Sequence, residues 1–146
     1  MKYYMLRIMI GIFGIAALLL TGCATHPKPQ AGMRAVDVPM EVTAYCSCGK
    51  CCNWKRNWLF KPVVASGPNA GKPKKVGITA CGLKAKKGTI AADTDKYPFG
   101  TIMYIPGYGY GRVEDRGKAI KGKERIDIFF EKHKEALQWG RRSTKV

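Results

Sequence analysis

The stretch RVEDRGKAIKGKERIDIFF, residues 112–130, sets acidic side chains inside or directly after two short apolar runs. The chain has 26 Lys and Arg residues against 10 Asp and Glu residues, and four of the ten acids fall within this stretch. Asp115 ends the run at residues 111–115, and Asp127 lies between two isoleucines in the run at residues 125–130. Turn-forming and basic residues bound both runs, a pattern typical of short β-strands.

Other parts of the chain repeat this pattern of short apolar runs between Gly and Pro residues. The further segments that predict strands are residues 38–45, which alternate at period two, residues 88–93, residues 100–107 and, as a closing strand, residues 141–146. About six short strands favour a small, mainly β barrel over a sandwich, which usually needs more strands.

One helix and one long loop complete the predicted domain. Residues 131–139 predict a short helix that buries Ala136, Leu137 and Trp139 and ends at Gly140. Residues 53–77 are rich in Lys and Pro and predict a loop between the first two strands.

The N-terminal residues predict export. Lys2 and Arg7 precede an apolar stretch at residues 8–20, as in a secretory signal peptide covering residues 1–22. The sequence LTGC resembles the lipobox of bacterial lipoproteins, which implies cleavage before Cys23 and lipidation of its thiol. A plain signal peptide and an uncleaved anchor are the alternatives. Residues 23–37 then read as a tether, and residues 38–146 as one domain.

The charge balance narrows the possible partners. The formal charge is +16, and it falls to +14 once Lys2 and Arg7 are removed with the signal peptide. A basic exported domain meets cell-wall polymers and anionic lipid headgroups rather than nucleic acid, and we find no nucleic-acid-binding motif. We expect a monomer anchored to a membrane on the cell-envelope side, which is the outer membrane or periplasm in a Gram-negative cell.

A cluster of cysteines follows the first predicted strand. In an exported protein disulfides are favoured, while a structural metal site and free thiols are the alternatives. His133 is the one histidine in the predicted helix. It lies between two lysines and is therefore expected to be solvated, so no catalytic Cys–His pair is predicted. The candidate thiols are Cys46, Cys48, Cys51 and Cys52, with Cys81 as a further contributor.

Three aspartates stand out as candidates for chemistry, because Asp93, Asp115 and Asp127 each end or interrupt an apolar run. Apolar surroundings and a second carboxylate raise the pKa of a carboxyl group, which can then act as the general acid that cleaves a glycosidic bond. Alternatively, the three side chains accept hydrogen bonds from turn amides or pair with nearby arginines.

The same segments resemble the 3D domain, named for three aspartates, of bacterial cell-wall proteins and MltA-type lytic transglycosylases. The resemblance spans about residues 42–142 and rests on A-x-D before P-x-G-T, D-x-G before A-I-K-G, and I-D-I-F-F. It implies a double-psi β-barrel that cleaves the bond between N-acetylmuramic acid and N-acetylglucosamine in peptidoglycan and forms a 1,6-anhydro ring, without a cofactor. A non-catalytic wall-binding or expansin-like module is the alternative.

The resemblance also implies roles for individual residues. Asp127 matches the family's single acid/base, Asp115 matches the neighbour that tunes it, and Asp93 matches the aspartate that shapes the site. Thr79 matches a sugar-binding threonine. The sequence departs from the D-T-G-G of many relatives at Arg116, whose charge is expected to lower the pKa of a nearby Asp. The basic candidates for holding the glycan are Lys118 and Lys121, and the aromatic ones are Trp54 and Trp58.

Overall fold

A computed structural model describes residues 29–32 and 34–146 of the chain. The predicted signal peptide and the lipidation at Cys23 lie outside the described residues. The described tether residues, 29–32 and 34–37, are exposed and contain neither a helix nor a strand. No helix in the described part of the chain combines the length and apolar character needed to cross a bilayer.

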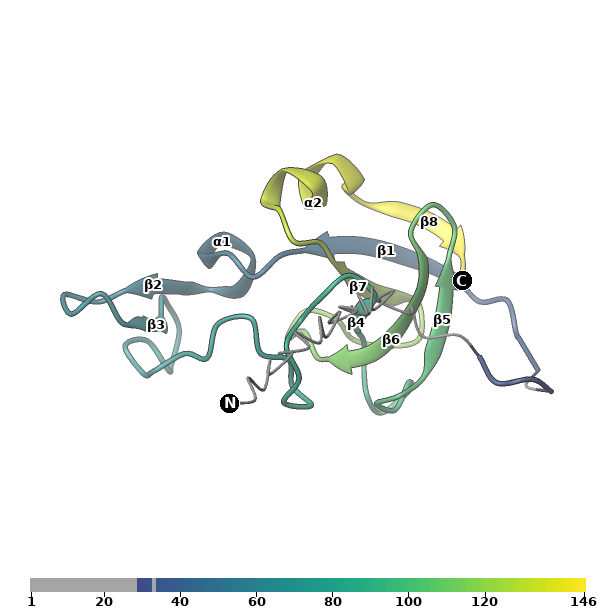
Figure 1. Ribbon diagram of the computed structural model, residues 1–146, viewed down its shortest axis with the longest axis horizontal. Helices are drawn as coiled ribbons and strands as arrows, with labels where there is room; N and C mark the ends of the chain where they lie inside the picture. The colour runs from purple at the N-terminus through teal and green to yellow at the C-terminus, as the bar shows by residue number, and fades with distance from the viewer. Residues whose placement is uncertain (1–28, 33) are drawn as a thin grey trace, which may run out of the picture.

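Six strands form one curled sheet with the order β5-β6-β4-β7-β1-β8 (Figure 1). Two neighbouring pairs, β1 with β7 and β4 with β6, run parallel, and the other pairs are antiparallel. The bounds are β1 Pro39–Tyr45, β4 Thr89–Ala91, β5 Ile102–Ile105, β6 Gly109–Asp115, β7 Arg125–Phe129 and β8 Arg142–Lys145. The sheet curls into half a barrel, so the prediction of a small, mainly β, six-stranded fold is confirmed.

The predicted strands agree with the observed ones because glycine turns delimit them. Gly100 and Gly107, for example, adopt φ values of +94° and +79° on either side of β5, a backbone conformation that other residues rarely adopt. The predicted helix forms as α2, His133–Trp139. It buries Ala136 and Trp139 but leaves Leu137 67% exposed, so the prediction that Leu137 is buried was wrong.

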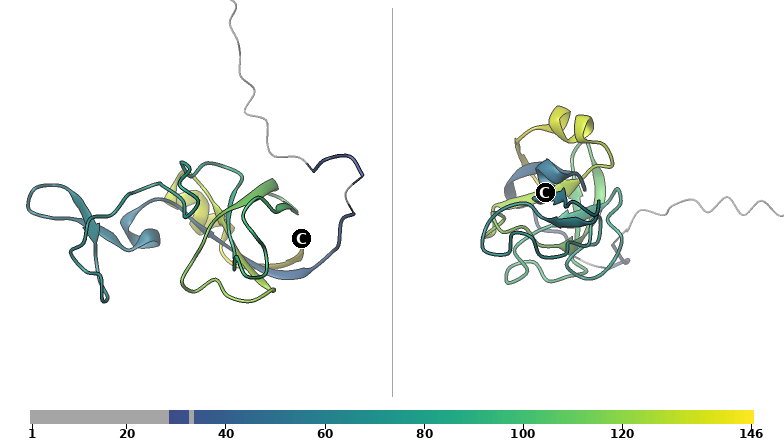
Figure 2. Two further views of the ribbon diagram at one scale, coloured as in Figure 1. Left: turned by 90° about the horizontal axis from the view of Figure 1, so that it is seen from below. Right: turned by 90° about the vertical axis from the view of Figure 1, so that its left-hand side faces the viewer.

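The segment predicted as a loop instead forms an arm. A one-turn helix, α1 (Gly49–Cys52), precedes a two-stranded sheet of β2 (Trp54–Arg56) and β3 (Pro62–Val64) that projects from one side of the barrel (Figures 1 and 2). The strands have three residues each, too few for a period-two pattern to show.

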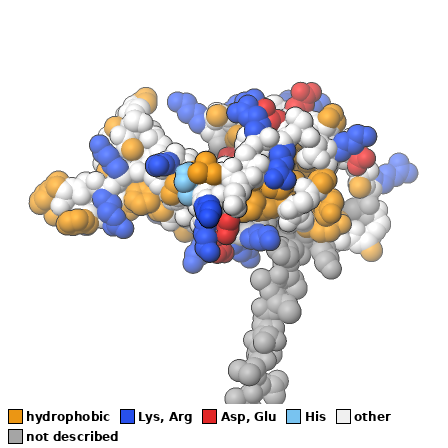
Figure 3. All heavy atoms as spheres, turned by 90° about the horizontal axis from the view of Figure 1, so that it is seen from above, with side chains coloured by type: hydrophobic (Ala, Val, Ile, Leu, Met, Phe, Trp, Pro, Cys, Tyr) orange, Lys and Arg blue, Asp and Glu red, His pale blue; other side chains and the backbone are white. Residues whose placement is uncertain are grey.

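The tip of the arm carries exposed apolar side chains. Trp58 is 84% exposed and Phe60 76% exposed, and the end of the arm shows hydrophobic side chains beside Lys and Arg (Figure 3). Trp54 differs, since its indole N–H donates to the carbonyl of Ser47 at 2.8 Å and fixes the base of the arm. Of the two tryptophans expected to meet glycan, Trp58 is exposed and Trp54 is partly buried.

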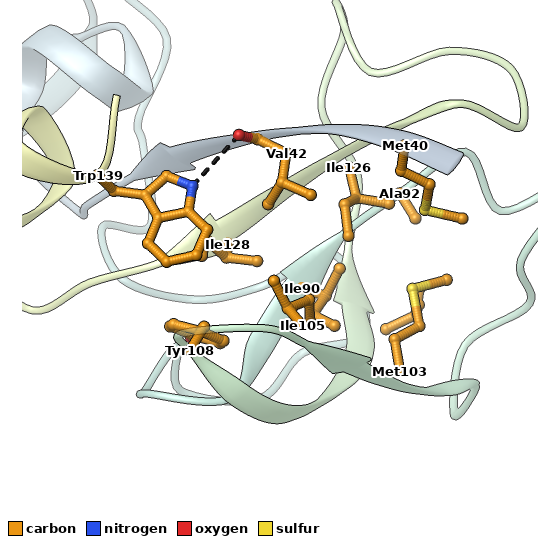
Figure 4. Packing of buried hydrophobic residues seen from close by; sticks show 11 residues of the cluster. Met40, Val42, Ile90, Ala92, Met103, Ile105, Tyr108, Ile126, Ile128 and Trp139 are labelled. Carbon is orange, nitrogen blue, oxygen red and sulfur yellow. Dashed lines mark hydrogen bonds between the residues drawn. The ribbon is translucent and has the colours of Figure 1, made fainter. Parts of the chain in front are cut away.

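The main core lies on one face of the sheet (Figure 4). Alternate residues of the strands point into it, and the indole N–H of Trp139 on α2 donates to the carbonyl of Val42 on β1 at 3.2 Å. Because side chains alternate along a strand, the intervening residues of β1 and β7 point to the opposite face. The buried members of this core are Met40, Val42, Ile90, Ala92, Met103, Ile105, Tyr108, Val113, Ile126, Ile128 and Trp139.

A second, smaller cluster covers the opposite face of the sheet. Tyr45 on β1, Ala91 on β4 and Phe129 on β7 form it, and the rings of Tyr45 and Phe129 meet edge to face with centroids 5.4 Å apart. The candidate functional site is built on this face.

Candidate functional site

Asp127 lies in the middle of a central strand, on the face opposite the main core. Its neighbours Ile126 and Ile128 are fully buried in that core, which fixes the direction of the Asp127 side chain. Parallel pairing of β1 with β7 sets Thr43 beside Asp127, and the Thr43 hydroxyl donates to Asp127 Oδ1 at 2.9 Å. The carboxyl group is therefore held by one neutral donor.

A bulge turns Asp115 toward the same face. Ile90 of β4 pairs with Val113 of β6, but the next residue, Ala91, pairs with Asp115, which leaves Glu114 as an extra residue on β6. Without the bulge, Asp115 would share the face of Val113, which points into the main core. The irregularity thus brings a second carboxylate to the site.

The Asp115 carboxylate is held by three donors. The Tyr45 hydroxyl donates to Oδ2 at 2.9 Å, and the backbone N–H groups of Ala80 and Arg116 both donate to Oδ1 at 2.9 Å. Burial and the neighbouring Asp115 charge raise the pKa of Tyr45, which stays a hydrogen-bond donor. These three donors fix the position of the Asp115 carboxylate.

Ala91 separates the two carboxylates, because it pairs with Asp115 on one side and with Asp127 on the other. Two strand spacings put their Cα atoms about 10 Å apart. The small methyl group between them leaves room for a cavity of about 360 Å³ that both acids line. Its basic lining residues are Lys74, Lys75, Arg116 and Lys118.

The pKa of Asp127 is raised from 3.8 to about 6, first by burial and also by the negative charge of Asp115, while the hydrogen bond from Thr43 acts to lower it. Asp127 therefore takes up a proton close to neutral pH. A carboxyl group with a raised pKa, in a cavity that a second carboxylate also lines, suits acid/base chemistry on a glycosidic bond.

Asp93 lies elsewhere. It is 7% exposed, does not line the cavity, and accepts hydrogen bonds from the backbone N–H groups of Gly122 at 2.9 Å and Asp95 at 3.2 Å. These two N–H groups, and then the nearby Lys121 and Lys96 charges, lower the pKa of the Asp93 carboxyl. Asp93 therefore stabilises the loop before β7 through these hydrogen bonds.

Three further residues were predicted to bind sugar: Thr79, Lys118 and Lys121. Of these, only Lys118 lines the cavity. The Thr79 hydroxyl is buried, donates to the carbonyl of Leu83 at 3.0 Å and accepts from its N–H at 3.1 Å, so it closes a turn. Lys121 lies 3.8 Å from Asp93, away from the cavity, whereas Lys118 lines it.

Arg116 was expected to lower the pKa of an adjacent Asp. Its guanidinium instead lies over the ring of Phe99, with Cζ 5.6 Å from the ring centroid. The groups that change the pKa of Asp127, besides burial, are Thr43 and Asp115. For Asp127 the expected effect of Arg116 is therefore absent.

Sequence reasoning missed Thr43 and Tyr45, the two side chains of β1 that hold the carboxylates. The alternation of residues 42–45 contains a usable signal, because it sets both on the face opposite Val42. What the sequence does not contain is the register that pairs Thr43 with Asp127.

The five described cysteines are all free thiols, so the structure does not contain the predicted disulfides. The prediction that His133 is a solvated helix position was also wrong. Its Nδ1 atom lies 3.5 Å from the Sγ atoms of both Cys48 and Cys51 and 3.7 Å from that of Cys46. Cys52 and Cys81 lie outside this group, so the alternative four-thiol metal site is not assembled.

Two known proteins each match about half of this chain. YabE of Bacillus subtilis (strain 168), to which a cell-wall-shaping role is attributed, is 38% identical over 74 residues, which make up 48% of this chain and 18% of YabE. The cell wall-binding protein YocH of the same organism is 36% identical over 74 residues, 48% of this chain and 25% of YocH. The chain thus spans a quarter or less of the length of these relatives.

The family comparison covers β4 to β8. Asp115 lies in β6, Asp127 lies in β7, and Asp93 follows β4 by two residues. Residues 88–146 match the family model of the 3D domain. This part of the chain is therefore similar to the 3D domain.

Proposed function

We propose that the domain is a peptidoglycan lytic transglycosylase that uses Asp127 as its single acid/base. The observation that carries the proposal is the half-buried Asp127 carboxyl, with a pKa raised to about 6, in a cavity shared with Asp115. The match of residues 88–146 to the 3D domain and the cell-wall roles in the names of YabE and YocH support peptidoglycan as the substrate.

In the proposed reaction the protonated Asp127 donates its proton to the glycosidic oxygen. The bond between this oxygen and C1 of N-acetylmuramic acid breaks at the same time. The C6 hydroxyl of the same muramic acid then attacks C1, and its proton passes to the Asp127 carboxylate. The glycan gains a 1,6-anhydro ring, no water is consumed, and Asp127 returns to its protonated form. With a pKa of about 6, about one molecule in ten carries this proton at pH 7.

Asp115 has a supporting role in this proposal. Its negative charge favours the protonated form of Asp127 before the reaction, and it stabilises positive charge at C1 as the bond breaks. The basic rim of the cavity, which includes Lys74, Lys75 and Lys118, suits the carboxylates of peptidoglycan. A location outside the cytoplasm follows from such a substrate, and anchoring through Cys23 remains part of the proposal.

A non-catalytic wall-binding module is the second candidate, favoured by the name of YocH. Incubating purified peptidoglycan with the protein and analysing the soluble products by mass spectrometry separates the two. We expect 1,6-anhydromuropeptides. Retention of the protein on insoluble wall, without released fragments, would leave the binding module as the function.

Replacing Asp115 by Asn is expected to move the loss of activity at high pH to a lower pH. Activity falls as the pH rises through the pKa of Asp127, because the proton donor is then lost. Asp115 raises this pKa, so removal of its charge lowers it. The measurement is the initial rate of anhydromuropeptide release between pH 4 and pH 8.

Thr43→Val is the matched variant, with an effect of opposite sign. The Thr43 hydroxyl stabilises the ionised form of Asp127, so its removal raises the pKa and moves the loss of activity to a higher pH. Val keeps the branched shape of Thr within the strand. Shifts of both variants in the same direction would contradict the assignment of Asp127 as the titrating acid.

A further inference from the structure

Three thiols and one imidazole nitrogen meet at the junction between the barrel and the arm. They belong to Cys46, Cys48, Cys51 and His133, and their ligand atoms all lie within 4.8 Å of one another. We propose that these four residues bind a structural zinc ion.

The separations agree with tetrahedral coordination. With Zn–S bonds of about 2.3 Å and Zn–N bonds of about 2.0–2.1 Å, a tetrahedron has S···S edges of about 3.8 Å and S···N edges of about 3.6 Å. The Sγ atoms of Cys46 and Cys51 lie 3.8 Å apart. The three separations between Nδ1 of His133 and the thiols are 3.5, 3.5 and 3.7 Å. A central ion therefore fits with little rearrangement.

The fold brings the ligands from two distant segments, as structural zinc sites commonly do. Cys46 directly follows β1 and is 2% exposed, Cys48 is the N-cap of α1, and Cys51 lies within α1. The fourth ligand, His133, is the first residue of α2, which packs on β1. The parallel pairing of β1 with β7 therefore fixes the distance between the two segments, since α2 follows β7.

The tight turn at the cluster requires glycine. A Cβ atom on Gly49, between Cys48 and Cys51, would lie 2.3 Å from the backbone carbonyl oxygen of Trp54. The backbone can therefore approach the Trp54 carbonyl here only because residue 49 has no side chain. A loop shaped to this degree is expected for a ligand-binding turn.

The three thiolates and one imidazole indicate which metal binds and what it does. Thiolate and imidazole ligands favour zinc over the oxygen-seeking magnesium and calcium ions. Four protein ligands leave no open position for water or substrate, so the ion is structural. On binding, each thiol releases its proton, and the resulting Zn²⁺–(thiolate)₃–imidazole group carries a formal charge of −1. The surrounding chain is strongly basic and accommodates this charge.

The remaining cysteines are excluded by their contacts. The thiol of Cys52 donates to the carbonyl of Cys46 at 3.2 Å and lines the cavity of the two aspartates. Cys81 is exposed and lies 3.3 Å from the Thr79 hydroxyl.

The zinc ion would fasten one wall of the candidate site. Ser47, Cys51, Cys52 and Asn53 line the cavity and belong to the segment that the ion would tie to α2. The ion thus holds both the cavity wall and the base of the arm, and it does so whether or not the domain cleaves glycan.

The test measures metal content in the full chain, purified without chelators. Elemental analysis is expected to give about one zinc per chain, and His133→Ala and Cys48→Ser are expected to lose it. Cys52→Ser and Cys81→Ser are matched controls that keep the metal, because their thiols lie outside the cluster. Circular dichroism separates loss of metal from loss of fold.

A second measurement uses the wild-type chain alone. Cobalt(II) added after removal of zinc is expected to give thiolate-to-metal charge-transfer absorption and the intense visible bands of tetrahedral cobalt. Removal of the metal by a chelator is expected to lower the Tm by about 10 °C or more. A chain without metal and without cobalt bands, a Cys46–Cys51 disulfide detected by mass spectrometry, or metal retained in His133→Ala would each overturn the proposal.

Discussion

Replacing Asp127 by Asn is expected to reduce the release of anhydromuropeptides by about 10²- to 10⁴-fold, the usual contribution of a general acid/base. Asn has nearly the same shape and can accept the hydrogen bond from Thr43, but it cannot donate and recover a proton. Initial rates at pH 6, near the pKa of Asp127, measure the effect where the wild-type acid is substantially protonated.

The same variant is expected to be more stable than the wild type at pH 7. The folded pKa of Asp127, about 6, exceeds the value of about 3.9 in the unfolded chain. Between these values the folded state binds more protons, so wild-type stability falls as the pH rises from about 4 to 6 and then levels off. Asn removes this penalty, which amounts to about 1–3 kcal/mol at pH 7 and vanishes below pH 4.

Thermal unfolding at pH 4 and pH 7 measures this difference, with Asp37→Asn as the control. Asp37 is exposed and lies before β1, so its replacement should change neither the rate nor the Tm. Retained activity in Asp127→Asn would exclude Asp127 as the acid/base. Equal stability of variant and wild type at pH 7 would show that its carboxyl is not desolvated.

Most of the sheet could be predicted from the sequence, because the relevant signals are local. Period-two alternation marks β1, Gly88 precedes β4, glycines lie on both sides of β5, and the apolar run around Asp127 marks β7. The arm escaped prediction since β2 and β3 are three residues long and contain Lys, Arg and Pro. Their pairing depends on turn contacts such as the Asn57 side chain accepting from the N–H groups of Leu59 and Lys61.

The candidate site was predicted less completely, because it depends on register. The bulge at Glu114 decides that Asp115 joins Asp127 and not the core, and a bulge adds only one residue to a strand. Asp93 and Thr79 have the expected residue types, but their polar atoms are occupied by backbone groups of their own turns.

His133 illustrates the same limit. Its flanking lysines indicate a solvated surface, and only the packing of α2 on β1 brings its ring to the thiols. The local sequence places the three cysteines close together. Tertiary contacts bring His133 to them, which makes it the fourth ligand of the proposed zinc site.

Replacing Ile128 by Ala is expected to lower the free energy of unfolding by about 2–5 kcal/mol, although Ile128 is adjacent to Asp127. Its side chain has 0% exposure and packs in the main core, where β7 pairs with β1 on one side and β4 on the other. Truncation leaves a cavity between central strands that cannot close without moving their neighbours. Urea unfolding at pH 7 measures the change, and the Tm should fall by about 20 °C.

Leu137→Ala removes an apolar side chain of similar size from a site that is 67% exposed, so its expected change is within about 0.5 kcal/mol. A small loss in Ile128→Ala, comparable to that of Leu137→Ala, would contradict the core described for this sheet. The two β7 variants then have opposite consequences: Asp127→Asn gains stability and loses activity, while Ile128→Ala loses stability. Adjacent residues differ in this way because a strand turns successive side chains to opposite faces, and β7 has the core on one face and the two-carboxylate cavity on the other.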